Sequence, residues 1–125
     1  MLKSILLVGF GGFIGSVARF LVSRYFQENV LSVFPWGTFV VNIVGSLIIG
    51  LVFGLSERGS FLSPEARLFL TVGFCGGFTT FSSLSNDAFM LLKQQEWIRF
   101  TLYTSISFSL GLFAVFAGRF IIKSI

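Results

Sequence analysis

The stretch GFCGGFTTFSS, residues Gly73–Ser83, decides how the middle of this chain folds. It lies inside a long apolar run, yet it combines three glycines with four hydroxyl residues in eleven positions. One interpretation is an intact membrane helix with a packing face of small and hydroxyl residues. The other is a break in that helix. Gly76 and Gly77, followed after one residue by Thr79 and Thr80, give poor helix propensity over five positions and favour the break.

The composition is that of an integral membrane protein. Of 125 residues, 54% are hydrophobic and 11% are charged, and the mean hydropathy is +0.92. Because about twenty apolar residues cross the hydrocarbon core, this length allows about four crossings. The sequence predicts an all-α fold with a single transmembrane domain over residues 1–125. Its four helices are expected over about 4–26, 37–55, 64–93 and 97–122.

Local signals support the ends of these helices. The first run is interrupted by Arg19 and lacks a small-residue cleavage site, so we expect a retained helix and not a signal peptide. The segment Ser63–Glu65 combines a possible N-cap, a proline at the first helical position and an acidic first turn. It therefore predicts the start of the third helix.

The residue inventory excludes several classes of function. One cysteine and no histidine exclude both a disulfide and a cysteine/histidine metal cluster within one chain. The nine basic residues are scattered singly at the ends of the apolar runs, which fits membrane flanks better than nucleic acid. Asp87 is the only acidic residue within a run. Without paired carboxylates or a Ser/His/Asp set, the sequence predicts that the protein is not an enzyme.

The basic residues, which set the orientation of membrane proteins, are nearly balanced across the four predicted crossings. One side collects Lys3, Arg58, Arg67, Arg119 and Lys123, and the other collects Arg24, Lys93 and Arg99. This weak asymmetry permits insertion in both orientations. The two halves of the chain do not align with each other, so any symmetry must come from a second copy. We therefore expect an antiparallel, dual-topology homodimer.

A helix break within a membrane leaves backbone carbonyl and amide groups that need partners from protein, water or an ion. Free carbonyls suit a hard cation such as sodium, and the ends of half-helices favour ions of the matching sign. In an antiparallel dimer two such breaks could meet at the two-fold axis. One cation would then collect carbonyls from both chains.

Three motifs follow one another along the predicted crossings: GGFIGSVAR at Gly11–Arg19, GTFVVN at Gly37–Asn42 and GFCGGFTTFSSLSND at Gly73–Asp87. Over essentially the whole chain, they resemble the Fluc (CrcB) family of bacterial fluoride channels. The resemblance implies a passive fluoride-selective channel in the bacterial plasma (inner) membrane, which exports cytoplasmic fluoride and relieves its toxicity. It also implies an antiparallel homodimer with two antiparallel pores and a structural sodium ion at its centre.

The resemblance also implies roles for individual residues. The backbone carbonyls of Gly76 and Thr79 would hold the sodium ion. Asn42 and Phe81 would line the pore, and Arg19 would lie near a vestibule.

At position 84 the family has a second pore phenylalanine, where this sequence has Leu84. At position 87 it usually has glutamate, where this sequence has Asp87. Asn42 and Arg19 also have simpler interpretations: an interhelical hydrogen bond for Asn42 and a side chain that extends to the lipid headgroups for Arg19. Both interpretations stay open at the level of sequence.

The residue types around the break suit a small anion independently of that resemblance. Fluoride holds water tightly, so a pore must replace that water with hydrogen-bond donors and with the weakly positive ring edges of phenylalanine. The expected donors are the amide of Asn42 and the hydroxyls of Thr80, Ser82, Ser83 and Ser85. Thr104 of the last helix is expected to continue the polar track.

Two other functions stay open. A small exporter of cationic compounds could have the same length and dual topology, but its chemistry requires a carboxylate deep in the bilayer. Asp87 is the only candidate for that carboxylate. The third possibility is a helical accessory subunit that conducts nothing.

Overall fold

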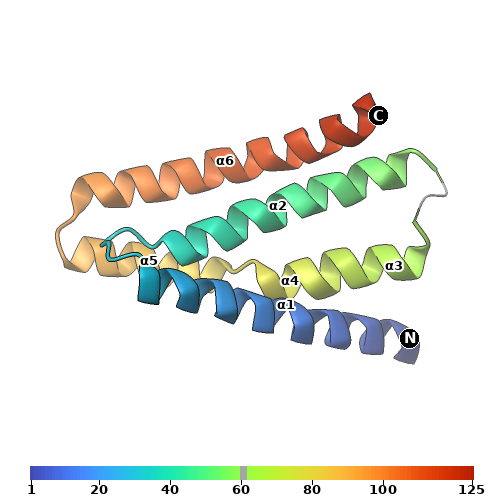
Figure 1. The fold of residues 1–125 in the computed structure, drawn as a ribbon, viewed down its shortest axis with the longest axis horizontal. Coiled ribbons are helices and arrows are strands. Elements are labelled where there is room, and N and C mark those ends of the chain that lie inside the picture. The colour runs from blue at the N-terminus through green and yellow to red at the C-terminus, as the bar shows by residue number, and fades with distance from the viewer. Residues whose placement is uncertain (60–61) are drawn as a thin grey trace.

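The computed structural model describes residues 1–59 and 62–125 and arranges them as long, roughly parallel rods (Figure 1). Within these residues, four segments are long and apolar enough to cross a membrane: Leu2–Asn29, Trp36–Glu57, Pro64–Lys93 and Trp97–Ser124. This confirms the predicted all-helical fold. Three segments extend beyond the expected ranges, because the polar residues that flank an apolar run continue its backbone hydrogen bonding.

Three of the spans are continuous helices, namely α1 (Leu2–Asn29), α2 (Trp36–Glu57) and α6 (Trp97–Ser124). The third span is divided into α3 (Pro64–Leu68), the π-helical segment η1 (Phe69–Cys75), α4 (Gly76–Phe78) and α5 (Phe81–Lys93). As the sequence predicts, Ser63 caps the start of this span, and its hydroxyl accepts a hydrogen bond from the Ala66 amide at 3.1 Å.

The break in the third span falls at Thr79 and Thr80, whose ψ angles of 158° and 118° are extended. It lies within the predicted region, but Gly76 and Gly77 themselves are helical. Poor propensity weakens a helix without fixing where it ends. The two β-branched threonines, which accommodate extended backbone well, form the break itself.

Glycines allow α1 to approach the first half of the third span closely. A Cβ atom added at Gly11 would lie 2.7 Å from the carbonyl oxygen of Phe69. A Cβ atom added at Gly77 would lie 2.5 Å from the carbonyl oxygen of Gly12. Such approach between backbones is typical of helix packing in membranes, where small residues form the contact.

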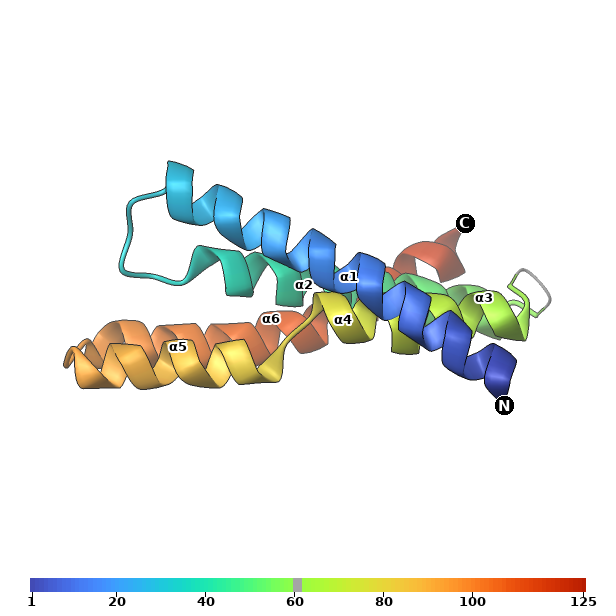
Figure 2. The same ribbon diagram turned by 90° about the horizontal axis from the view of Figure 1, so that it is seen from below.

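The two halves of the third span have different neighbours (Figure 2). α1 packs against η1 and α4, whereas α5 diverges from α1 and runs beside α6. α2 packs along α6, and a Cβ atom added at Gly118 would lie 2.5 Å from the carbonyl oxygen of Leu47. The break therefore separates α5 from the second half of α1.

An aromatic cluster holds the connection between α1 and α2 in place. The ring centroid of Phe34 lies 4.5 Å from that of Trp36, 5.6 Å from that of Phe39 and 5.3 Å from that of Tyr103. The pairs with Phe39 and Tyr103 meet edge to face, which is a favoured arrangement of aromatic rings. Because Tyr103 is fully buried in α6, the cluster attaches this connection to the core.

Candidate functional site

Asn42 of α2 binds both backbone polar groups of Thr80. The Thr80 amide donates to Asn42 Oδ1 at 2.8 Å, and Asn42 Nδ2 donates to the Thr80 carbonyl oxygen at 3.2 Å. The second bond uses one of the two hydrogens on the side-chain amide of Asn42. The structure therefore brings Asn42 to the break. Its role as a pore donor stays a prediction.

Arg19 of α1 reaches the other side of the break. Its Nε donates to the carbonyl oxygen of Gly77 at 2.9 Å. Gly77 belongs to α4, at a helix C-terminus where the carbonyls lack intrahelical partners. A cation is favoured at such an end by the helix dipole. Arg19 and Asn42 thus hold the two ends of the break from two different helices.

Three of the residues predicted to supply hydroxyl donors lie together at the start of α5. The Thr80 hydroxyl accepts a hydrogen bond from the Ser83 amide at 3.1 Å, and it lies 3.2 Å from the Ser82 hydroxyl. The helix dipole favours an anion at this N-terminal end. Phe81 is the first residue of α5 and is 80% exposed, whereas Leu84 is half-buried.

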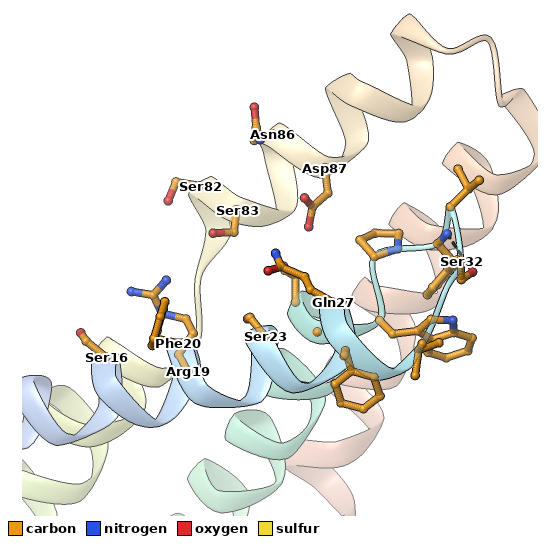
Figure 3. Close-up of a pocket in the computed structure, with 18 residues that line it drawn as sticks. Ser16, Arg19, Phe20, Ser23, Gln27, Ser32, Ser82, Ser83, Asn86 and Asp87 are labelled. Carbon is orange, nitrogen blue, oxygen red and sulfur yellow. Dashed lines mark hydrogen bonds between the residues drawn. The ribbon is translucent and has the colours of Figure 1, made fainter.

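A cavity of about 790 Å³ lies between α1, the connection from α1 to α2, and α5 (Figure 3). Its polar lining consists of Ser16, Arg19, Ser23, Gln27, Ser32, Thr38, Ser82, Ser83, Asn86 and Asp87. Figure 3 shows Arg19 extending from α1 toward the side of the cavity where Ser82 and Ser83 begin α5. The residues described as lining the cavity do not include Asn42, Phe81 or Leu84.

Asp87 also lines this cavity, and Tyr103 holds its carboxylate. The Tyr103 hydroxyl donates to Asp87 Oδ2 at 3.2 Å, and the side chain of Thr38 is a second hydrogen-bond partner of that hydroxyl. The other four acidic residues of the chain form ion pairs near helix ends. Sequence reasoning did not identify Tyr103 or Thr38, because an isolated polar atom within an apolar helix carries no recognisable pattern.

Thr104 bonds to its own helix. Its hydroxyl lies 3.0 Å from the carbonyl oxygen of Phe100 and 3.3 Å from that of Thr101, with both oxygens in α6. Within the described part of the chain, Thr104 does not line the cavity. Its place in a polar track stays a prediction.

The break offers backbone oxygens to a cation. Apart from the hydrogen bonds inside helices, no backbone hydrogen bond within residues 1–59 and 62–125 reaches the carbonyl oxygens of Gly76, Phe78 or Thr79. Carbonyl oxygens are suitable ligands for hard cations, so this donor set fits a sodium ion. Phe78 is buried, whereas Gly76 is exposed and Thr79 half-buried. Gly76 and Thr79, for which the family resemblance implies a role in sodium binding, are therefore nearer the surface than Phe78.

Side chains offer no comparable metal site in the described residues. They contain no group of three or more Cys, Asp or Glu side chains that could hold a metal ion. Any cation at the break would therefore depend on backbone oxygens. Arg19 and Asn42 donate hydrogen bonds to the neighbouring carbonyl oxygens of Gly77 and Thr80.

The whole chain is similar to proteins with assigned names. A family model described as "CrcB-like protein, Camphor Resistance (CrcB)" matches residues 6–119. A Bacteroides fragilis protein named "Fluoride-specific ion channel FluC" is 53% identical over 123 residues, which are 96% of each chain. Proteins of the same name from Leptospira interrogans and Flavobacterium psychrophilum are each 42% identical, over 98% and 99% of this chain and 96% and 100% of theirs.

These relatives are named as ion channels and not as enzymes, which confirms the prediction that this chain does not belong to an enzyme family. The organisms are bacteria, and four helices here are suited to crossing a membrane, as expected for a multi-pass protein of the bacterial plasma membrane. The resemblance carried by the three motifs is confirmed by the match over residues 6–119. The chain belongs to the CrcB-like protein family.

Proposed function

We propose that this protein is a passive, fluoride-selective channel that lets cytoplasmic fluoride leave the cell. The observation that carries the proposal is the start of α5, where Ser82 and Ser83 face a cavity that also contains Arg19. The names of the relatives support fluoride as the ion. Because these names describe fluoride-specific ion channels, an exporter of cationic compounds and an accessory subunit are not favoured.

The residues of the cavity can act on a small anion in sequence. The guanidinium of Arg19 attracts the anion into the cavity. The hydroxyls of Ser82 and Ser83 and the N-terminal end of α5 then replace part of its water. Phe81, next to these hydroxyls in the sequence but outside the cavity lining, would offer a weakly positive ring edge to the ion further along its path. The ion moves down its own gradient, so none of these residues needs to couple transport to ATP or protons.

We propose that two copies assemble in opposite orientations, with two antiparallel pores. The nearly balanced basic residues permit both orientations. The exposure of Gly76 on one chain supports a partner at the break, because a free carbonyl facing hydrocarbon is costly. Phe81, also exposed, lies only five positions further along the chain. A second copy that covers Gly76 and Phe81 would remove both residues from contact with lipid.

The proposed sodium ion would be held by the carbonyls of Gly76 and Thr79 from both copies. When bound, it would supply positive charge to oxygens that lack hydrogen-bond donors. Its role would be structural, since the anion-binding residues lie on α1 and α5. Fluoride movement itself is assigned to those residues.

Fluoride efflux from liposomes tests the channel function. Vesicles containing the purified protein are loaded with potassium fluoride, and valinomycin is added so that potassium can leave with the anion. We expect rapid release of fluoride at a fluoride electrode, and release of chloride no faster than from protein-free vesicles. Retention of fluoride, or release of chloride or a cationic dye in its place, would contradict the proposed channel.

The accessibility of a C-terminal tag tests the antiparallel dimer separately. In cells that express the tagged protein, antibody should reach the tag from both faces of the inner membrane. Each face should account for about half of the molecules if every dimer contains one copy in each orientation. A tag confined to one face would contradict dual topology, while the efflux result would still decide the channel function.

A further inference from the structure

We propose that Asn42 and Arg19 are positioning residues that determine which backbone carbonyls of the break are free to bind a cation. The inference rests on the proposed sodium site and extends it to two side chains that do not themselves ligate the ion. Both side chains contact the break directly, from α2 and from α1. They differ from pore donors because their polar atoms act on the backbone.

The hydrogen bonds around the break divide its carbonyls into two sets. The carbonyl of Cys75 accepts from the Thr79 amide at 2.9 Å and from the Thr79 hydroxyl at 2.8 Å. The carbonyl of Gly77 accepts from Arg19, and that of Thr80 accepts from Asn42. Within the described residues, this leaves the carbonyls at positions 76, 78 and 79 without a backbone donor from outside their own helix.

Asn42 removes the donor that Gly76 would otherwise have. In a continuous α-helix, the amide of residue 80 bonds to the carbonyl of residue 76. Here the Thr80 amide donates to Asn42 Oδ1 at 2.8 Å. The side chain of Asn42 thus competes with helix continuation and keeps the Gly76 oxygen free. Its Nδ2 holds the Thr80 carbonyl in the same arrangement.

Arg19 fixes the last turn of the first half-helix. A charged donor at the Gly77 carbonyl forms a stronger hydrogen bond than a neutral donor does. This bond joins one peptide of α4 to α1. The carbonyls on either side of it, at positions 76 and 78, cannot share that donor. Arg19 therefore orients the turn that contains Gly76, which is an exposed residue.

The sodium dependence of thermal unfolding tests both roles without measuring fluoride. The full chain is melted in detergent across a sodium chloride series, with N-methylglucamine chloride holding the ionic strength constant. We expect the wild-type midpoint temperature to rise with sodium, because a ligand that binds only the folded state stabilises it.

Variants at the two positions should change the sodium concentration that gives half of this rise. Asn42→Ala allows the Thr80 amide to rejoin Gly76, so we expect that concentration to rise about tenfold or more. Arg19→Ala should also raise it, and Arg19→Lys, which keeps a charged donor, should restore part of the difference. Thr101→Ala is the control, because the Thr101 hydroxyl bonds to Trp97 in its own helix.

Asn42→Asp supplies a second test if Asn42→Ala fails to fold. An aspartate keeps the acceptor for the Thr80 amide, which leaves the Gly76 carbonyl free, and loses only the Nδ2 bond to the Thr80 carbonyl, so most of the sodium response should be kept. Wild-type sodium dependence in Asn42→Ala, or its loss in Asn42→Asp, would overturn the proposal. If the wild-type chain shows no sodium response, both the positioning roles and the proposed sodium site are wrong. The fluoride efflux assay would still decide the channel function separately.

Discussion

Phe81→Ala is expected to lower the rate of fluoride efflux about tenfold or more, which corresponds to about 1.4 kcal/mol in the barrier to passage. The reason is that Phe81 begins α5 beside the Thr80 and Ser82 hydroxyls and is 80% exposed in the single chain. Its ring therefore adds little to the core but is available to an anion. Efflux is measured per unit of reconstituted protein, with helix content and assembly state checked in detergent.

A matched phenylalanine on α6 serves as the control. Phe113 is 67% exposed and lies outside the three sequence motifs. Phe113→Ala should leave the rate of efflux close to that of the wild-type protein, because a ring that only contacts lipid does not interact with the permeating ion. Equal losses in the two variants, or unchanged efflux in Phe81→Ala, would exclude a specific role for Phe81.

Tyr103→Ala is expected to reduce the free energy of unfolding by about 3–5 kcal/mol, as is typical when a buried aromatic side chain is removed. Tyr103 is fully buried, and its ring lies 5.3 Å from that of Phe34. The substitution leaves a void and detaches the connection between α1 and α2 from α6. Denaturant unfolding in detergent micelles, followed by circular dichroism, measures the change.

The conservative variant Tyr103→Phe separates packing from hydrogen bonding. It keeps the ring but removes the donor that lies 3.2 Å from Asp87 Oδ2. The expected loss is about 1.5–3 kcal/mol, the range for a hydrogen bond to a charged group. A loss in Tyr103→Phe as large as that in Tyr103→Ala would show that the hydrogen bond, and not the ring, carries the effect.

The sequence predicts the helices well because their signals are local. Apolar runs of sufficient length define the spans, and Ser63–Glu65 marks the start of the third span before any packing is known. The break is also predicted, within Gly76–Thr80, but the sequence does not show that Thr79 and Thr80 are the residues of this region that leave the helix. That position depends on Asn42, which lies 38 positions earlier in the chain.

The π-helical segment η1 is a second feature that the sequence does not predict. It covers Phe69–Cys75, where small and large apolar residues are compatible with an ordinary α-helix. Its wider turns place Gly73 against Gly11 of α1, in a contact between backbones. The spacing that makes this contact is set by the packing of two helices, so one helix alone does not reveal it.

The candidate site also contains some residues that the sequence alone brings together and others whose role depends on helix packing. Thr80, Ser82 and Ser83 come together because they are neighbours in the sequence at the start of one helix. The contribution of Tyr103 depends on the orientation of α6 relative to α5, which hydropathy alone does not determine. Leu84, at the position where the resemblance implies a second pore phenylalanine, is half-buried and is not among the described residues that line the cavity.

The zero-current voltage across a planar bilayer containing the purified protein tests passive fluoride selectivity most directly. Fluoride is set at a tenfold gradient, with chloride at the opposite gradient. A fluoride-selective passive pore should give a zero-current voltage of about 59 mV in magnitude. Its sign should be the one expected for an anion that follows the fluoride gradient and not the chloride gradient. A voltage of the opposite sign, set by chloride, or no current under these conditions would contradict the proposed channel.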